Sequence, residues 1–240
     1  MGLFDKKTCD ICGEKIGLLG NRKLEDGNMC KDCTKKLSPF FSDRRSSTVA
    51  EIKDQLAYRE ENKKAVATFN VTRTLGGNTK VLLDEDAGKF VVTYSRKWQE
   101  DNPDVIDFTQ VTGCETDIRE NKTELKREGK DGFQESYNPP RYEYDYDFYV
   151  IIHVNSQWFD EIEFRVNTST VDRRGSTEYR EAEEQAKAIR KALTEVRESV
   201  RESVAAAKTS RKAQQCPSCG ASVVPDENGC CTYCGGSLEA

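Results

Sequence analysis

The sequence predicts an α+β protein in which a central antiparallel sheet is followed by one long helix, with a small cysteine-rich module at each end. Three observations lead to this class. Paired cysteines lie near both ends of the chain, apolar runs of period two fill its middle, and an apolar seam of helical period runs through residues 176–207. The expected domains are a zinc ribbon at 1–40, a linker helix at 41–67, a β domain with its closing helix at 68–209, and a second zinc ribbon at 210–240.

Composition narrows the class of protein. Of the 240 residues, 36% are hydrophobic and 33% are charged, which is typical of a folded and well-charged chain. The formal net charge of −5 gives the whole molecule no electrostatic reason to bind nucleic acid or anionic lipid. No run approaches the roughly 18–20 apolar residues that span a bilayer. The segment MGLFDKK lacks a signal-peptide core, and Lys6 stands where a myristoylation motif has Ser or Thr. We therefore expect a cytoplasmic protein, whose ten cysteines serve as metal ligands or free thiols.

The first cysteine cluster has the spacing of a four-thiolate zinc site. Cys9, Cys12, Cys30 and Cys33 form the pattern C-x2-C-x17-C-x2-C. Two residues between cysteines allow one tight turn to direct both sulfur atoms at one ion, and two such turns complete a tetrahedron. Gly13 follows the first pair, where such a turn favours a positive φ.

The second cluster repeats this chemistry. Its predicted ligands are Cys216, Cys219, Cys231 and Cys234, and each pair is followed by glycine. Cys230 is an alternative to Cys231, although its use would break the two-residue spacing. We expect two Zn²⁺ ions per chain, with iron as the alternative, because four thiolates suit both metals. A closed four-thiolate shell leaves no position for water or substrate, so both sites are expected to be structural.

Between the clusters, several elements are predicted. Thr48 and Glu51 form a capping box at the start of a helix over 49–66, whose thin apolar stripe holds Val49, Ile52, Leu56, Arg59 and Lys63.

KVLLDEDAGKFVVTY is expected to be a β-hairpin, and VTGCETDI a strand with Cys114, Thr116 and Ile118 on one face. Residues 120–141 favour a loop or an edge hairpin. Two long strands then turn near Asn155, with two sets of residues facing the core: Phe148, Val150, Ile152 and Val154, then Ile162, Phe164 and Val166.

The final helix is predicted over about 176–207. Its seam comprises Tyr179, Ala182, Ala186, Ile189, Leu193, Val196 and Val200. It is expected to cover the sheet, and a coiled-coil dimer is the alternative. A compact antiparallel sheet or barrel with a long C-terminal helix matches the plan of the pleckstrin-homology-like (PH-like) domains.

The block CDICGEKIGLLGNRKLEDGNMCKDC, with the following KKLSPFFSDRRSSTVAEI, resembles an uncharacterised family of bacterial proteins, mostly from Firmicutes. The resemblance covers about the first fifty-five residues and implies an N-terminal four-cysteine zinc ribbon. KFVVTY and VIDFTQVTGCE resemble bacterial PH-like or GRAM-like domains. CPSCG with CTYCGG is similar to generic C-terminal zinc ribbons. The family has no known activity, so the resemblance implies a fold and no function.

These features favour a non-enzymatic interaction or adaptor protein whose core binds a protein partner. Nucleic-acid binding by the first ribbon is the main alternative, through Lys15, Arg22, Lys23, Lys31, Lys35, Lys36, Arg44 and Arg45, although nearby acidic residues almost balance these charges. Binding of membrane lipid by the PH-like core is less favoured. The basic residues available for it, Lys122, Lys126, Arg127 and Lys130, alternate with carboxylates.

No catalytic constellation is evident in the sequence. Cys114 is interpreted as a small buried residue, and His153, the only histidine, as a packing or surface residue of a strand. Alternation places Glu143, Asp145 and Asp147 on one face of an edge strand, which is a better peptide-binding edge than a catalytic dyad. We therefore expect no enzymatic activity, while the partner and the oligomeric state are left open.

Overall fold

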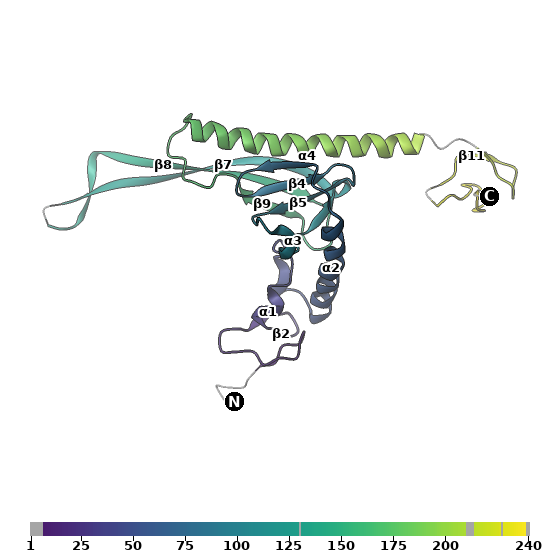
Figure 1. Ribbon diagram of the computed structural model, residues 1–240, viewed down its shortest axis with the longest axis horizontal. Helices are drawn as coiled ribbons and strands as arrows, with labels where there is room; N and C mark the ends of the chain where they lie inside the picture. Colours follow the sequence, from purple (N-terminus) through teal and green to yellow (C-terminus); the bar gives the residue numbers. More distant parts are fainter. Residues whose placement is uncertain (1–6, 130, 210–213, 227, 239–240) are drawn as a thin grey trace. The chain divides into compact units, whose positions relative to one another are not determined.

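The computed structural model describes residues 7–129, 131–209, 214–226 and 228–238. The chain forms two compact units, residues 1–195 and 196–240, and the division between them falls within the long helix α4 (Thr177–Thr209) (Figure 1). The α+β class, the antiparallel sheets and the long C-terminal helix are thus confirmed. The strands belong to separate sheets and close no barrel among the described residues, so the barrel prediction is wrong.

The N-terminal module consists of very short elements followed by one full helix. Strands β1 (Arg22–Lys23) and β2 (Asn28–Met29) form a hairpin, and helix α1 (Lys31–Thr34) follows directly. A 3-10 turn, η1 (Asp43–Arg45), leads to helix α2 (Val49–Thr68). The predicted capping box of α2 is present: the Thr48 hydroxyl accepts from the Glu51 backbone N–H, and the Glu51 carboxylate accepts from the Thr48 backbone.

The predicted stripe of α2 is confirmed in part: Ile52 and Arg59 are buried, and Val49 and Leu56 pack against the apolar cluster of the first module. The buried face holds Ile52, Gln55, Arg59, Asn62 and Val66, so it is largely polar, whereas Lys63 is exposed. The physical reason is the surface on which the helix packs. Asn62 donates to the Pro103 carbonyl at 2.7 Å and accepts from the Val105 N–H at 2.9 Å, so the helix satisfies backbone groups that approach it.

The first sheet of the core has four antiparallel strands in the order β3-β4-β5-β6. Their bounds are β3 Arg73–Gly76, β4 Lys80–Asp84, β5 Lys89–Thr93 and β6 Val105–Asp107, with helix α3 (Trp98–Asp101) between the last two and the 3-10 turn η2 (Phe108–Gln110) after them. The predicted hairpin is β4–β5, in which the Asp84 side chain accepts from the Ala87 N–H at 2.9 Å and fixes the turn.

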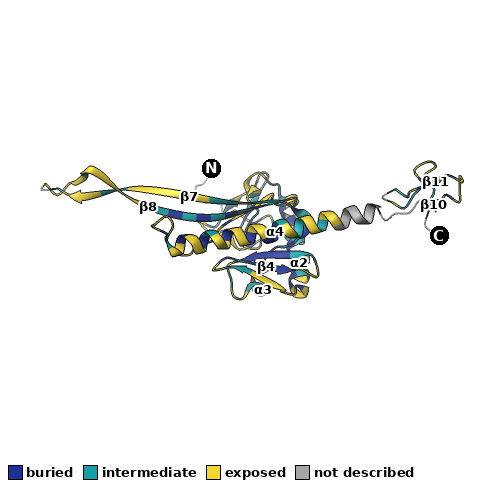
Figure 2. Ribbon diagram, turned by 90° about the horizontal axis from the view of Figure 1, so that it is seen from above, coloured by how far each residue is buried: buried dark blue, intermediate teal, exposed yellow. Residues whose placement is uncertain are grey.

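The second sheet has the order β7-β8-β9 and is built from β7 (Val111–Glu128), β8 (Gln134–Val154) and β9 (Glu161–Arg165). The predicted core faces are confirmed: Phe148, Val150, Ile152, Val154, Ile162, Phe164 and Val166 are all buried. Residues 120–141 were predicted to be a loop or an edge hairpin, and the structure has the hairpin. β7 and β8 pair out to Glu128 and Gln134, with a bulge at residues 137–140, and form a two-stranded ribbon that extends beyond the sheet and is largely exposed (Figures 1 and 2).

Helix α4 places its predicted seam against the core along its first half. Tyr179, Ala182, Ala186, Ile189 and Leu193 are buried, whereas Val196 and Val200 are half-buried. The Tyr179 ring lies edge-on to Phe148, with 4.8 Å between ring centroids, so the helix covers the core face of β8. The first half of the seam therefore packs on the sheet of its own chain and is not free to form a coiled coil with a second chain.

The second unit contains a hairpin of two short strands, β10 (Gln214–Gln215) and β11 (Ser222–Val223). Its buried apolar residues are Cys216, Val223, Cys231 and Leu238. Four side chains, two of them cysteines, cannot supply a stable hydrophobic core, so this module needs a cross-link or a metal to fold.

Candidate metal centres

Two groups of four cysteines converge in the described part of the chain, and they are the eight predicted ligands. The Sγ atoms of Cys9, Cys12, Cys30 and Cys33 all lie within 4.8 Å of one another, as do those of Cys216, Cys219, Cys231 and Cys234. Zinc–sulfur bonds of about 2.3 Å in a tetrahedron place sulfur atoms roughly 3.8 Å apart. The measured separations are 3.8 Å for Cys12–Cys30, 3.6 Å for Cys216–Cys234 and 3.7 Å for Cys219–Cys231. The sulfur geometry therefore fits a tetrahedral ion in both clusters.

Three of the four Cys-x-x-Cys pairs form the same tight turn. In the first, the Cys9 N–H donates to the Glu14 carbonyl at 2.9 Å, and the Gly13 N–H donates to the Cys9 carbonyl at 2.8 Å. The turns that begin at Cys216 and Cys231 repeat both bonds with the equivalent residues. The glycine after each pair has a φ of +77°, +74° or +70°, for Gly13, Gly220 and Gly235 respectively. The glycines identified in the sequence thus allow the backbone to turn under the metal site.

The fourth pair is different. Cys30 is the N-cap of helix α1, where its sulfur accepts from the Cys33 N–H at 3.4 Å, and the Cys30 N–H itself donates to the Cys9 sulfur at 3.2 Å. The prediction of two like turns is wrong for the first cluster, which combines one glycine turn with one helix N-terminus. The positive end of a helix is a favourable place for thiolates.

The first module shares its core with helix α2. Leu24 and Met29 of the hairpin are fully buried in the same apolar cluster as Ile52. The Val49 N–H at the start of α2 donates to the Asp26 carboxylate at 2.7 Å. The physical unit around the first cluster therefore includes the first turns of α2.

Electrostatics within each cluster favour a bound cation. At Cys9 the largest influence is burial, which opposes ionisation, but backbone donors from Cys12, Cys30 and Ile11 outweigh it and lower the thiol pKa to about 7. Burial and the neighbouring thiols instead raise the pKa of Cys33 strongly. In the second cluster, the Cys219 backbone N–H is the main cause that lowers the pKa of Cys216 to about 6. Four thiolates repel one another unless a positive ion lies between them.

Cys230 lies outside the second group of converging sulfurs, which contains Cys231. The Cys230 N–H donates to the Asp226 carboxylate at 2.8 Å, and its sulfur lies 3.7 Å from the Asn228 carbonyl. The geometry therefore favours the two-residue spacing over the alternative in which Cys230 is a ligand.

The other residues singled out in the sequence do not form a site together. Cys114 is half-buried in β7, where burial raises its thiol pKa to about 12. His153 lies between Glu115 and Glu161, with nitrogen–oxygen distances of 3.6 and 3.7 Å. Asp147 pairs with Arg165 at 3.0 Å, whereas Glu143 lies further along the exposed ribbon, opposite Thr123. Lys122, Lys126 and Arg127 lie along β7 of the ribbon, and Lys130 is outside the described residues.

Comparison with known proteins identifies one family. Residues 8–55 match a domain of unknown function, DUF4428. The matched segment holds the first cysteine cluster and ends inside α2, so it coincides with the physical unit described above. No curated protein and no solved structure matches the chain. The N-terminal part is thus similar to a domain family defined by sequence.

Sequence reasoning missed the residues that join this unit to the core. Arg59 of α2 pairs with Asp104, which precedes β6, at 2.7 Å, and both side chains are almost fully buried. Neither residue belongs to a recognisable motif. The one available signal was an arginine at a position that the helical period assigned to the buried stripe.

Proposed function

We propose that this chain is a non-enzymatic interaction protein of the bacterial cytoplasm, with two structural zinc ribbons and a PH-like core that binds a protein partner. The single observation that carries the proposal is the exposed β7–β8 ribbon, which extends the core face of β8 outward (Figure 2). The family resemblance supports the bacterial assignment. No helix among the described residues is long and apolar enough to cross a membrane.

Two structural zinc ions agree with the chemistry of both clusters. All four ligands are thiolates in each case, so a bound ion has no vacant coordination position at which a substrate could react. The modules are too small to fold on their own apolar contacts, and ion binding would supply the missing free energy. Iron fits the same ligands, and the visible absorption of an iron–thiolate centre distinguishes it from colourless zinc.

The face that the ribbon presents has the composition of a protein-binding surface. Along β8, Phe148 and Tyr146 are buried, Tyr144 is half-buried and Tyr142 is 41% exposed, so one aromatic row passes from the core into solvent. The Lys122 ammonium lies 3.9 Å from the centre of the Tyr142 ring. Tyrosines held by neighbouring cations offer a large contact area at a low entropic cost, which is typical of interfaces.

The backbone of the ribbon adds a second feature. β9 pairs with β8 only over Tyr149–His153, and an isolated bridge joins Tyr146 to Val171. Further out, Asp145–Arg141 and Ser136–Gln134 of β8 pair with β7 alone in the described part of the chain, and residues 137–140 between them form a bulge outside the register. Its free edge can accept an extended peptide as an added strand, with the tyrosines contacting alternate side chains of that peptide.

The experiment is affinity capture from lysate of the native host, with nuclease present, followed by mass spectrometry. A shortened variant joins Asn121 to Asp145, which face each other in the ribbon, through an Asn-Gly turn. We expect a discrete protein partner that survives nuclease and is lost with the shortened ribbon and with Tyr142→Ala/Tyr144→Ala. Tyr94→Ala, which removes a tyrosine that is 57% exposed elsewhere, should keep the partner.

Two results would contradict the proposal. One is a partner that the shortened variant retains, since the ribbon would then take no part in binding. The other is capture that disappears on nuclease treatment, since nucleic acid would then be the ligand. Far-UV circular dichroism and zinc content of the shortened variant establish that the remaining chain is folded.

A further inference from the structure

The first module exposes two leucines at the corners of a tight turn. The Gly20 N–H donates to the Gly17 carbonyl at 3.0 Å, which closes a four-residue turn with Leu18 and Leu19 at its two central positions. Their side chains are 90% and 87% exposed. Turn corners normally carry polar residues or glycine, so this turn departs from ordinary turn chemistry.

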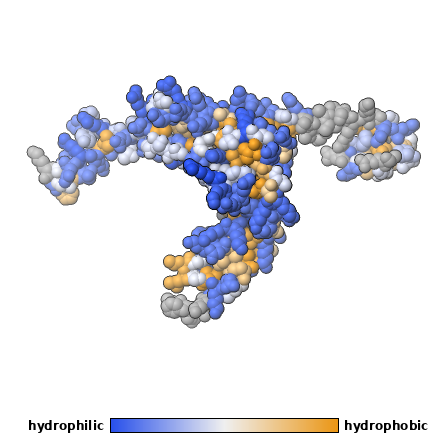
Figure 3. Space-filling view, viewed as in Figure 1, coloured by the Kyte–Doolittle hydropathy of each residue, from blue (hydrophilic) through white to orange (hydrophobic). Residues whose placement is uncertain are grey.

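These leucines are exposed although the same module has an apolar core that buries other large side chains. In the same module Leu24 and Met29 are completely buried, and Ile16, one residue before the turn, is 8% exposed. The module therefore buries these large apolar residues and leaves the Leu18–Leu19 pair exposed in the turn. Apolar side chains show as exposed patches on the surface of this module (Figure 3). An exposed apolar pair beside a well-buried apolar cluster indicates a surface that binds another molecule or a membrane.

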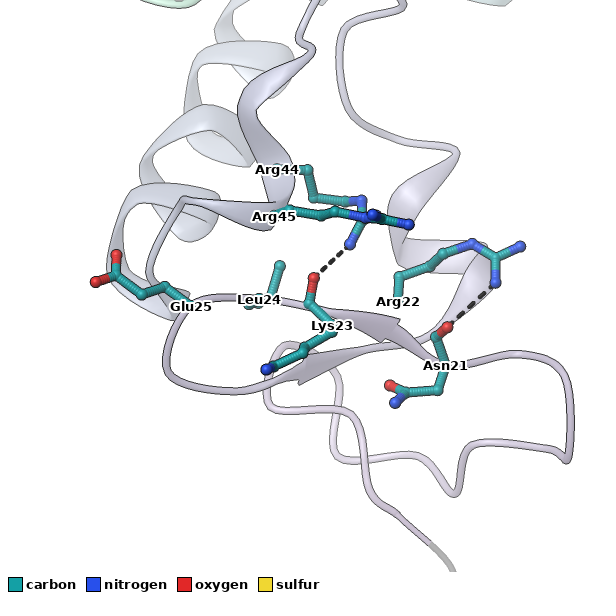
Figure 4. Close-up of a pocket in the computed structure, with 7 residues that line it drawn as sticks. All are labelled: Asn21, Arg22, Lys23, Leu24, Glu25, Arg44 and Arg45. Carbon is teal, nitrogen blue, oxygen red and sulfur yellow. Dashed lines mark hydrogen bonds between the residues drawn. The ribbon is translucent and has the colours of Figure 1, made fainter.

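Four cations surround an open depression of about 780 Å³ beside the turn: Arg22, Lys23, Arg44 and Arg45. The Arg22 guanidinium donates to the Leu19 carbonyl at 3.3 Å, which places this cation against the turn itself. Arg44 donates to the Lys23 carbonyl at 2.6 Å, which holds the turn η1 against β1 (Figure 4). Two segments that are distant in the sequence thus bring their positive charges together.

These charges lack a counter-ion within the described residues. None of the four takes part in an ion pair with a carboxylate there, and Glu25, at the rim, directs its carboxylate away from the guanidinium groups (Figure 4). Burial and then the repulsion from Arg45 and Arg22 lower the pKa of Arg44. A bound anion would relieve this repulsion.

From this geometry we infer that the N-terminal module docks on the surface of an anionic lipid bilayer. Leu18 and Leu19 enter the boundary between headgroups and acyl chains, while the four cations bind lipid phosphates and carboxylates around them. An apolar tip beside a basic rim is the combination that binds such surfaces, since the two contributions add. This function lies beyond the protein-binding role of the ribbon, and an adaptor held on a membrane could carry out both.

The observations favour a bilayer over nucleic acid. Phosphates of nucleic acid would neutralise the cations, but they offer no apolar surface for the two leucines. Binding of single strands uses aromatic side chains on which bases stack, and no aromatic residue lines the depression. From the sequence, nucleic acid was the ligand considered for this module and lipid was considered only for the PH-like core, because the sequence shows the charges without showing that the leucines are exposed beside them.

The test is co-sedimentation of the full-length, zinc-loaded protein with vesicles of phosphatidylcholine, alone or with about one-third phosphatidylserine. We expect binding to the anionic vesicles only, weakening as salt rises. Leu18→Ser/Leu19→Ser should weaken binding at least about tenfold. Lys23→Gln/Arg45→Gln should weaken it about fivefold for each cation removed. These four side chains make no hydrogen bond in the described structure, so the variants should fold and hold zinc normally.

Matched controls separate this surface from general effects of charge and hydrophobicity. Phe133→Ser removes a 75% exposed aromatic residue from the far end of the ribbon, and Lys63→Gln/Lys64→Gln removes two exposed cations from α2. Both should bind vesicles as the wild type does. The proposal is overturned if anionic vesicles fail to bind, or if the leucine variant binds them normally. It is also overturned if oligonucleotides compete with the vesicles and bind the leucine variant as tightly as the wild type.

Discussion

Arg59, on the buried face of α2, donates from Nη1 to Asp104 Oδ1 at 2.7 Å, and the side chains are 6% and 0% exposed. The second oxygen of Asp104 accepts from the Ser38 hydroxyl, also at 2.7 Å. Arg59 donates further to the carbonyls of Lys36 and Asn102. One buried ion pair thus ties together the end of the first cysteine module, helix α2 and the segment before β6.

We predict that this pair sets the stability of the junction. Arg59→Met leaves a buried carboxylate without its cation and should lower the free energy of unfolding by about 3–5 kcal/mol. Arg59→Met/Asp104→Leu removes both charges and should restore much of that loss. Urea unfolding followed by circular dichroism measures both changes. Lys63→Ala, which breaks an exposed pair with Glu60 on the same helix, should change stability by at most about 0.5 kcal/mol. Equal stability of Arg59→Met and Lys63→Ala would contradict the prediction.

The glycine turns give a second prediction. Gly13 has a φ of +77°, and no atom lies within 4 Å of an added Cβ, so Gly13→Ala is opposed by the backbone conformation alone. That conformation costs alanine about 1–2 kcal/mol. We expect zinc affinity at the first cluster to fall about tenfold, as measured by competition with a chromophoric chelator.

Gly17→Ala is the matched control for this substitution. Gly17 lies in the same module, has equally open surroundings and does not require a positive φ. The control should bind zinc as tightly as the wild type. A similar loss of affinity in both variants would show that the positive φ of Gly13 does not matter for the site.

The cysteine clusters, the capping box of α2 and the β4–β5 hairpin could be predicted from the sequence because each depends on residues close together in the chain. A Cys-x-x-Cys-Gly turn, a Thr48–Glu51 cap and an Asp-rich turn each carry their own local hydrogen bonds. The core faces of β8 and β9 followed from simple alternation, since one side of each strand is buried.

The parts that were missed depend on pairing over long distances. The ribbon over 120–141 is rich in charge, glycine and proline, so the local pattern did not decide between a loop and an edge hairpin. Cation–aromatic contacts such as Lys122 with Tyr142 stabilise the hairpin across the strands. The buried face of α2 is polar because its partners are backbone groups near Pro103, which no pattern in the helix reveals. The exposure of Leu18 could not be read from a sequence in which most leucines are buried.

Metal content gives a third prediction. Native mass spectrometry of the full chain should show two zinc ions, because each cluster places four sulfur atoms at tetrahedral separations. Cys231→Ser should retain a single ion, since three thiolates bind zinc far more weakly than four. Cys230→Ser should retain two, since Cys230 lies outside the cluster. If Cys230→Ser loses an ion and Cys231→Ser keeps two, the fourth ligand is Cys230 and the assignment of Cys231 is wrong.

The last prediction concerns the reactivity of Cys114. Burial is the main cause that raises the pKa of this thiol to about 12, the Glu115 carboxylate adds to the increase, and Arg190 of α4 opposes it. Because the thiolate is the reactive form, a raised pKa means that only about one thiol in ten thousand is ionised at pH 8.

In zinc-loaded Cys230→Ser protein, where the eight ligands are occupied, iodoacetamide should label Cys114 slowly. The labelling rate should rise about tenfold for each pH unit between 7 and 10. Arg190→Gln, which removes the one charge that favours the thiolate, should slow labelling further at every pH. A rate that levels off below pH 9 would show that Cys114 ionises as an ordinary exposed thiol and that burial does not raise its pKa.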